Sequence, residues 1–242
     1  MLDVTAAVST TAVGSLNPDF RPGDLVLIDQ FIDMTKSREG TFFDGVHRGV
    51  AHIDMTDPYC PSLRSAVVEA GRKQGITVHD GGTYICTEGP RFETPAEIRA
   101  FRSWGADVVG MTNVPEAQLA REAEICYSTI SMVTNFAAGM SSEPLTHSEV
   151  LECMNRNISH FQQIISVLAS SYDTDRDCSC RHAASEFGGI PVMKRRLSAL
   201  YWKGDRLILL DQTLLPETIS YKTCYNVEDT ADAIRKLIVR GA

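Results

Sequence analysis

The sequence lacks three features that would point to a membrane, secreted or nucleic-acid-binding protein. No apolar run reaches the roughly 18 residues that a membrane-spanning helix needs. Residues 1–11 lack the basic head and the cleavage site of a secretory signal. Basic side chains are outnumbered, 23 Lys and Arg against 31 Asp and Glu, whereas nucleic-acid binders carry basic patches. We therefore expect a cytoplasmic protein without a nucleic-acid or membrane partner.

Cysteine is present but does not follow the pattern of a disulfide framework or a metal site. The seven Cys are an odd number, and five of them are scattered singly, as expected of small buried hydrophobic residues. Only Cys178 and Cys180 lie close in sequence. No second Cys pair follows them, so the spacing predicts a flexible, redox-sensitive segment rather than a zinc site. No dinucleotide fingerprint appears either, so we expect neither a metal nor an organic cofactor.

The first three-quarters of the chain alternates apolar runs with amphipathic stretches, which is typical of an α/β fold with a mixed central β-sheet flanked by helices. Thr94 to Glu97 has the form of a helix-capping box, and Pro61 suits the first turn of a helix. Strands are expected at 25–29, 76–79, 82–86, 107–110 and 127–134, and helices at 61–74, 94–104, 114–124 and 146–168.

The remaining quarter of the chain has a different character. A polar stretch follows residue 170, and residues 188–191 mark a second break. Residues 198–211 then alternate apolar and polar positions around Gly204, which predicts a hairpin, followed by a strand near Tyr221 and a helix over 227–239. We expect three parts: a main domain at 1–183, a linker at 184–195 and a short α+β appendage at 196–242.

Four segments placed where strands are expected to end carry side chains suited to binding a ligand. Small residues allow the backbone to approach an anion, an aromatic beside a carboxylate suits a flat heterocycle, and an amide offers both a donor and an acceptor. Each feature also has a structural interpretation: a simple turn, a core Phe92, or Glu93 as an ordinary helix-start acid. The segments are Thr11–Leu16, Glu88–Thr94, Gly110–Glu116 and Val133–Gly139.

In this order and at these spacings, the four segments resemble the family of methylthioadenosine phosphorylases and trimeric purine nucleoside phosphorylases. Residues 29–33, 58–61 and 101–109 match the family as well, so that the resemblance covers about residues 4–183. It implies a homotrimer and a pentosyltransferase reaction. Inorganic phosphate is then a co-substrate that displaces a purine from its ribose with inversion at the sugar carbon.

The resemblance also implies roles for individual residues. Thr11, Ala12 and Thr112 match phosphate contacts, and Met111 matches a ribose contact. Phe92 and Ala137 would line the base pocket. Asn135 and Glu93 are the expected catalytic residues, since Asn135 stands where the family stabilises the departing purine at N7. His147 resembles a histidine that contacts the 5′-hydroxyl; as a helix-start residue it could equally lie on the surface.

The expected base is a 6-oxopurine, as in inosine or guanosine. Members specific for methylthioadenosine have Asp where this chain has Asn135 and Ala137. An amide suits N7 and O6, and Glu93 would accept a hydrogen bond from the N1–H that only a 6-oxopurine carries. Methylthioinosine and methylthioadenosine stay open as alternative substrates.

Two features leave further alternatives. The family carries a Gly-rich phosphate turn and an Arg-His pair before the Thr-Ala segment, which this chain lacks, so phosphate binding could be impaired and the chain an inactive remnant. Residues 200–212 and 233–242 resemble the start of methylthioribose-1-phosphate isomerases. That resemblance implies a fusion with a fragment of a sugar-phosphate isomerase.

Overall fold

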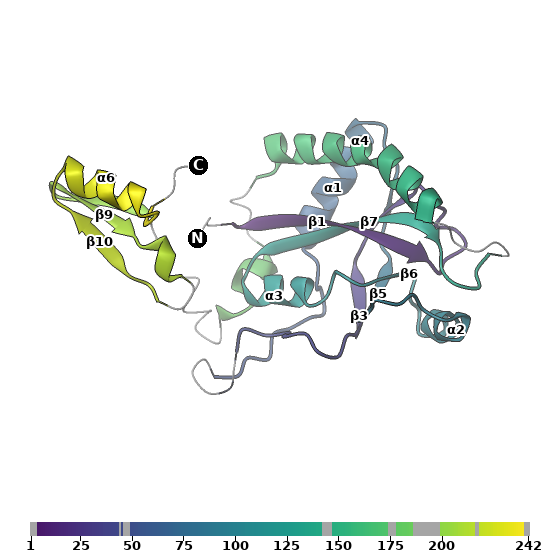
Figure 1. Ribbon diagram of the computed structural model, residues 1–242. Helices are drawn as coiled ribbons and strands as arrows, with labels where there is room; N and C mark the ends of the chain where they lie inside the picture. The colour runs from purple at the N-terminus through teal and green to yellow at the C-terminus, as the bar shows by residue number, and fades with distance from the viewer. Residues whose placement is uncertain are drawn as a thin grey trace. The chain divides into compact units, whose positions relative to one another are not determined.

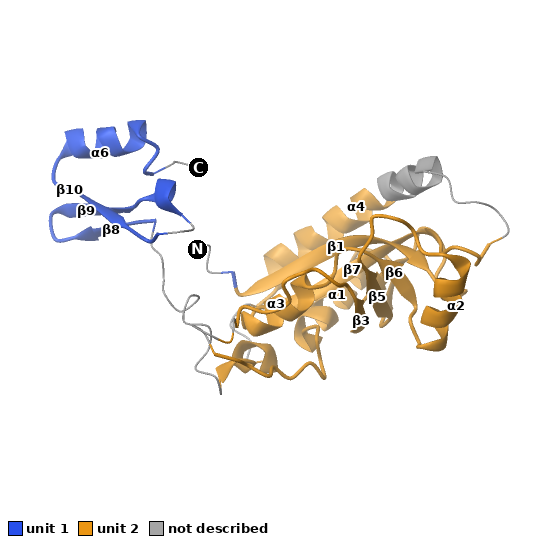
Figure 2. Ribbon diagram, turned by 60° about the horizontal axis from the view of Figure 1, so that its bottom comes forward, with its two compact units in different colours: residues 1–4, 191–242 blue, residues 5–190 orange. Residues whose placement is uncertain are grey.

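The computed structural model describes residues 4–43, 45, 49–141, 147–173, 178–185, 199–215 and 218–239, with the backbone alone for 147–156. The chain divides into two compact units, one of residues 5–190 and one that contains residues 191–242 (Figure 2). In the described residues, no helix is long and apolar enough to cross a membrane.

A seven-stranded mixed sheet forms the centre of the larger unit (Figure 1). Its middle is made by the two longest strands, which lie side by side in parallel over ten paired positions. The strand order is β3-β5-β6-β1-β7-β2-β4. The bounds are β1 Ala6–Ser15, β2 Leu25–Leu27, β3 Gln30–Met34, β4 Val78–Asp80, β5 Thr83–Thr87, β6 Val108–Gly110 and β7 Cys126–Phe136.

Helices cover both faces of this sheet. Helices α1 (Pro61–Lys73) and α4 (His147–Ser171) cover one face, where Leu27, Ile130 and Ile164 share an apolar cluster (Figure 1). Helix α3 (Glu116–Glu122) lies on the other face, and helix α2 (Pro95–Ser103) packs near the end of β6. The expected mixed central sheet with flanking helices is confirmed.

The helix-start signals in the sequence are used as expected. Thr94 Oγ1 accepts from the Glu97 backbone N–H, and the Glu97 carboxylate accepts from the Thr94 N–H, which completes the capping box of α2. Pro61 occupies the first turn of α1. Several boundaries differ: α3 begins at Glu116 rather than near 114, β4 runs over 78–80 rather than 76–79, and β1 continues through Ser15. Strand β3 was not expected.

The smaller unit is a three-stranded antiparallel sheet in the order β10-β9-β8 with one helix beside it. The hairpin of β8 (Leu200–Lys203) and β9 (Arg206–Leu210) turns at Gly204, whose φ of +65° is easily adopted by glycine. Strand β10 (Tyr221–Cys224) and helix α6 (Val227–Arg235) follow. A short 3₁₀ turn lies at Gln212–Leu214. The expected α+β character is confirmed, whereas the linker at 184–195 falls mostly outside the described residues.

Candidate active site

Strand pairing brings the four ligand-binding segments to one region of the sheet. Strands β5 and β6 run parallel and end at Thr87 and Gly110, with Cys86 opposite Gly110. Strand β1 runs antiparallel to β6, with Gly14 opposite Val109, so the residues after β6 lie beside those before Gly14. On its other side Gly14 pairs with Asn135 of β7. The segments around 11–15, 88–94, 110–115 and 133–139 therefore converge.

The expected phosphate contacts on β1 lie inside the strand, not in a loop after it. Thr11 is buried, and its hydroxyl forms a 2.8 Å hydrogen bond with Ser131 Oγ of β7. Ala12 is exposed on the opposite face of the strand. The expectation that residues 11–16 lie where a strand ends is wrong for residues 11–15, because the parallel pairing with β7 continues through Ser15, with a bulge at Val13 and Gly14. The backbone at Ala12, rather than a loop, is what an anion could approach.

The segment after β5 projects an aromatic and a carboxylate. Phe92 is 71% exposed, which rules out the core interpretation of this side chain. Glu93 precedes the N-cap of α2, so it is not part of the first helical turn, and its Oε1 accepts a 2.7 Å hydrogen bond from Thr87 Oγ1. That bond directs the carboxylate back over the end of β5. Phe92 is therefore not a core residue, and Glu93 is not an ordinary acid of the first helical turn.

Met111 and Thr112 occupy the turn between β6 and α3. The Met111 sulfur packs against Gly89, where an added Cβ would lie only 2.6 Å from it. Thr112 is exposed, and its N–H lies 3.3 Å from the Tyr84 hydroxyl. Thr112 lies between the strand and the helix, as expected, but α3 begins at Glu116 rather than near 114, so Thr112 stands further from the helix N-terminus. The packing against Gly89 joins the loop after β5, which carries Phe92 and Glu93, to Met111, the expected ribose contact.

Asn135 is half-buried near the end of β7 with its amide held by two hydrogen bonds. Its Oδ1 accepts from Thr134 Oγ1 at 2.7 Å, and its Nδ2 donates to the Phe136 carbonyl at 2.8 Å. An amide nitrogen carries two hydrogens, so Nδ2 has a second one to offer a ligand. Ala137 is 5% exposed and packs in the apolar cluster with Leu16.

Comparisons with known proteins give the family of this chain. The model of the family described as Phosphorylase superfamily matches residues 1–170. The chain belongs to the Phosphorylase superfamily. It is 54% identical over 186 residues to a probable 6-oxopurine nucleoside phosphorylase of Dictyoglomus turgidum, covering 77% of this chain and 70% of that protein. It is 51% identical to the 6-oxopurine nucleoside phosphorylase of Pyrococcus furiosus, covering 75% of this chain and 71% of that one.

A solved structure supports the same fold. The methylthioadenosine phosphorylase from an Antarctic soil metagenomic library is 36% identical and superposes with a TM-score of 0.70, covering 82% of this chain and 72% of that one. The two-layered arrangement of helices about a mixed sheet is thus that of a phosphorylase of this superfamily.

Arg38 contacts two loops of the candidate site, although it is not among the site residues expected from the sequence. Its guanidinium donates to the Val114 carbonyl at 2.5 Å and to the Glu88 carbonyl at 3.1 Å, so that it bridges the loops after β5 and β6. No local sequence motif marks this role, because the three segments are far apart in the chain. Arg38 positions the two loops that carry Glu93 and Met111.

The electrostatics of these loops follow from the same contacts. Hydrogen bonds from the Ser37 hydroxyl and the Lys36 N–H lower the pKa of the Glu88 carboxyl. Burial raises the pKa of the Tyr84 hydroxyl to about 12, so Tyr84 is neutral beneath Thr112. Glu88 therefore stays ionised, and its carboxylate joins the segment after β3 to the loop after β5 through these two hydrogen bonds.

One expected site residue cannot be placed. Helix α4 begins at His147, but the side chain of His147 lies outside the described residues. The expected contact with the 5′ position of the sugar stays a prediction.

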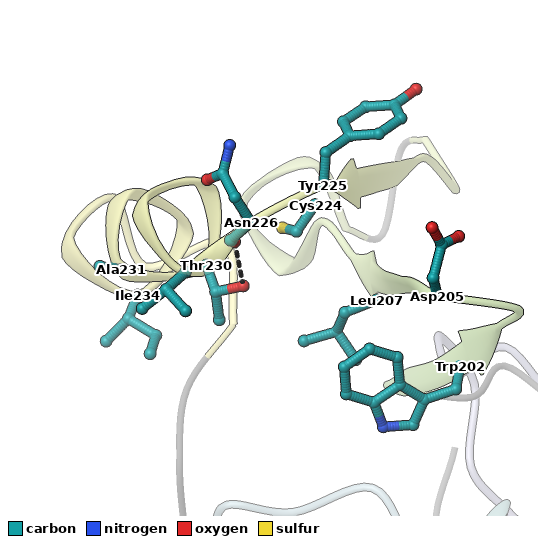
Figure 3. Close-up of a pocket in the computed structure, with 10 residues that line it drawn as sticks. Trp202, Asp205, Leu207, Cys224, Tyr225, Asn226, Thr230, Ala231 and Ile234 are labelled. Carbon is teal, nitrogen blue, oxygen red and sulfur yellow. Dashed lines mark hydrogen bonds between the residues drawn. The ribbon is translucent and has the colours of Figure 1, made fainter.

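A cavity of about 430 Å³ is formed by residues of the smaller unit alone. It is lined by Trp202 and Leu207 of the hairpin and by Thr230 and Ile234 of α6 (Figure 3). Its apolar walls include Trp202, which is 67% exposed. None of the residues expected from the phosphorylase resemblance contributes to it.

The expectation about cysteine needs correction. The spacing had suggested that Cys178 and Cys180 have too few neighbours to bind a metal, and that they belong to a flexible segment. Cys180 is 2% exposed in a short 3₁₀ turn at Ser179–His182, and the sulfur atoms of Cys60, Cys126, Cys178 and Cys180 all lie within 4.8 Å of one another. The sequence hid this cluster because its partners are single cysteines that come earlier in the chain.

Proposed function

We propose that this chain is a purine nucleoside phosphorylase that cleaves 6-oxopurine nucleosides, inosine and guanosine, with inorganic phosphate. The proposal is carried by two side chains at the strand ends: the Asn135 amide, which has a hydrogen to donate, and the Glu93 carboxylate, which the Thr87 hydroxyl holds over the end of β5. The names of the relatives from Dictyoglomus turgidum and Pyrococcus furiosus agree with this substrate class.

The reaction requires two kinds of stabilisation at opposite sides of the sugar. A phosphate oxygen forms a bond to the anomeric carbon as the bond to purine N9 breaks, and the bonding electrons leave with the purine. The backbone at Thr11 and Ala12 with the hydroxyl of Thr112 would hold the phosphate. The Asn135 amide would donate to N7 as negative charge develops on the departing base. The products are the free purine and ribose 1-phosphate.

Base selection follows from donor and acceptor matching. A 6-oxopurine has a hydrogen on N1, and the Glu93 carboxylate can only accept. Adenine has a bare N1, so its lone pair would face a carboxylate and the complex would lose a hydrogen bond. A buried polar group without its partner costs about 1–3 kcal/mol, equivalent to roughly a tenfold to hundredfold preference.

A second candidate substrate class is the methylthio-nucleosides, methylthioinosine or methylthioadenosine. The structural neighbour with a TM-score of 0.70 is named a methylthioadenosine phosphorylase. The 5′ substituent decides between this class and inosine, and the residue expected to contact it is His147.

The assembly and location are part of the same proposal. We infer a cytoplasmic homotrimer that needs no cofactor beyond phosphate as co-substrate. Light scattering coupled to size-exclusion chromatography measures the assembly directly. A monomer or a dimer would contradict the trimer while leaving the activity to be judged by the assay below.

The deciding experiment is base release by the full chain with inosine, guanosine, methylthioinosine and methylthioadenosine, each with and without phosphate. We expect phosphate-dependent release of hypoxanthine and guanine. Glu93→Gln should lower kcat/KM for inosine about tenfold to hundredfold. It should also reduce the preference for inosine over adenosine, assayed alongside, since the amide can both donate and accept a hydrogen bond. Glu69→Gln, on the exposed face of α1, is the matched control and should leave both rates unchanged.

Two results would overturn the proposal. Release from methylthioadenosine alone would replace the 6-oxopurine assignment with the second candidate. Release from none of the nucleosides, by a chain that is folded by circular dichroism, would reject activity for this chain.

A further inference from the structure

Four cysteine sulfur atoms converge at one end of the sheet, far from the candidate active site. They are contributed by three segments: Cys60 caps α1, Cys126 opens β7, and the 3₁₀ turn after α4 is preceded by Cys178 and contains Cys180. Cys126 is the first and Asn135 the tenth residue of β7. At about 3.3 Å per residue, the cluster lies about 30 Å along the strand from Asn135.

We propose that Cys60, Cys126, Cys178 and Cys180 form a structural tetrathiolate site for one zinc ion. The sulfur atoms all lie within 4.8 Å of one another. Zinc–sulfur bonds of about 2.3 Å in a regular tetrahedron set the ligand sulfur atoms about 3.8 Å apart. The Cys126–Cys178 and Cys60–Cys178 separations of 3.2 and 4.0 Å bracket that value.

Hydrogen bonds between the segments hold these ligands close to one another. The Cys60 N–H donates to the Tyr127 carbonyl at 2.8 Å, which ties the start of α1 to the start of β7. The Ala184 N–H donates to Glu124 Oε1 at 3.2 Å, which fastens the chain after Cys180 to the residues before β7. Three of the four cysteines are at most 4% exposed. A site whose donors are already gathered loses little chain entropy when the ion binds.

The surroundings suit a bound thiolate cluster. Cys60 Sγ accepts from the Leu63 N–H at 3.4 Å, at the N-terminus of α1, where the helix dipole favours negative charge. Arg181 and His182, both basic, directly follow Cys180 in the chain. Each cysteine would release its thiol proton to solvent when the ion binds, so zinc binding should weaken as the pH falls.

The choice of zinc follows from the donor set. Four thiolates without a carboxylate or a water position form a closed site, and tetrahedral sulfur coordination suits zinc. Such a site cannot bind substrate, so its role is to join three distant segments. Cys60 and Cys178 are 118 residues apart in sequence, and Cys126 and Cys178 are 52 residues apart. The ion would therefore cross-link segments from most of the length of the larger unit.

The test begins with the full wild-type chain, purified in two portions, one with a reductant and one without it. Elemental analysis by mass spectrometry should find about one zinc per chain. Replacing zinc with cobalt(II) should give the visible absorption of a tetrahedral cobalt thiolate, and removing the metal with a chelator should lower the melting temperature.

The variant Cys126→Ser should lose the cobalt thiolate spectrum and most of the zinc. Cys86→Ser removes a buried free cysteine of the same unit that lies outside the cluster, and should keep both. If Cys126→Ser does not fold, the wild-type measurements decide by themselves.

Three wild-type results would overturn the proposal. One is a zinc-free chain whose intact mass is lower by two hydrogens for each disulfide, which would make the cluster a disulfide pair. Another is a reduced chain that neither contains zinc nor develops the cobalt spectrum. The third is stoichiometric iron in place of zinc. None of these results depends on phosphorolytic activity, so the zinc site and the proposed function can fail separately.

Discussion

Replacing Asn135 with Asp tests the assignment of this side chain most directly. In the structure, Asn135 Nδ2 donates to the Phe136 carbonyl at 2.8 Å. A carboxylate oxygen in the same place would set two oxygen lone pairs against each other and would have no hydrogen for purine N7. Removal of one donor from a site of developing negative charge costs about 2.7–4 kcal/mol, or a factor of 10²–10³ in kcat.

We therefore expect Asn135→Asp to lower kcat for inosine by about two to three orders of magnitude, with a much smaller change in KM. Use of adenosine should fall less or rise, because a protonated carboxyl can donate to N7 and accept from the 6-amino group. The Phe136 carbonyl favours the protonated form of the new carboxyl and so raises its pKa. The activity of the variant toward adenosine should then be greatest at low pH and decline as the pH rises.

The assay is steady-state release of hypoxanthine and adenine, measured from pH 5 to 8 at saturating phosphate. Asn226→Asp is the matched control, because Asn226 caps α6 in the smaller unit and Asp caps a helix equally well. Its kinetics should equal those of the wild type. An unchanged ratio of inosine to adenosine turnover in Asn135→Asp, with the fold intact, would refute the reasoning about Asn135.

Three further outcomes follow from the loops and from α2. Arg38→Met should lower kcat/KM roughly tenfold to hundredfold, since the charged donors to the Val114 and Glu88 carbonyls are lost. Arg72→Met, on the surface, should leave kcat/KM unchanged. If Arg38→Met has the same kcat/KM as the wild type, Arg38 does not bridge the two loops in the way proposed. Thr94→Ala should lower the melting temperature by about 2–4 °C through loss of the N-cap, as differential scanning fluorimetry would detect. Arg91 holds the pKa of Glu97 at about 2, below its ordinary 4.5, so the stabilisation from this pair is complete above pH 4.5 and lost as the pH falls towards 2. The melting temperatures of wild type and Arg91→Met should therefore converge over that pH range, and a constant difference would count against the pair.

Much of the fold could be predicted because its signals are local. Pro61 at a helix start, the capping box of Thr94 and Glu97, and the Gly204 turn each depend on neighbours within a few residues. Strand boundaries were less certain. Residues 11–15 look like a turn because they are small, yet they continue β1, since the pairing that extends the strand comes from β7, some 120 residues later.

The candidate site was predictable in composition but not in arrangement. The motif order identified the loops and named Phe92, Glu93 and Asn135. It could not identify Arg38, because a guanidinium that reaches carbonyls of two other loops leaves no local pattern. Nor could it distinguish an exposed Phe92 from a core one, since the same residue type serves both purposes.

The α/β class, the family and the residue types at the strand ends could be predicted from the sequence alone, because periodicity, turn chemistry and motif spacing are local properties of the chain. Which distant residues meet became known from the folded structure. It turned Glu93 back onto Thr87, set Asn135 beside Gly14, and gathered Cys60 and Cys126 around the pair at 178 and 180. The physical reason is that hydrogen-bonded strand pairing and buried packing act between segments that lie far apart in sequence, and no local pattern records those contacts.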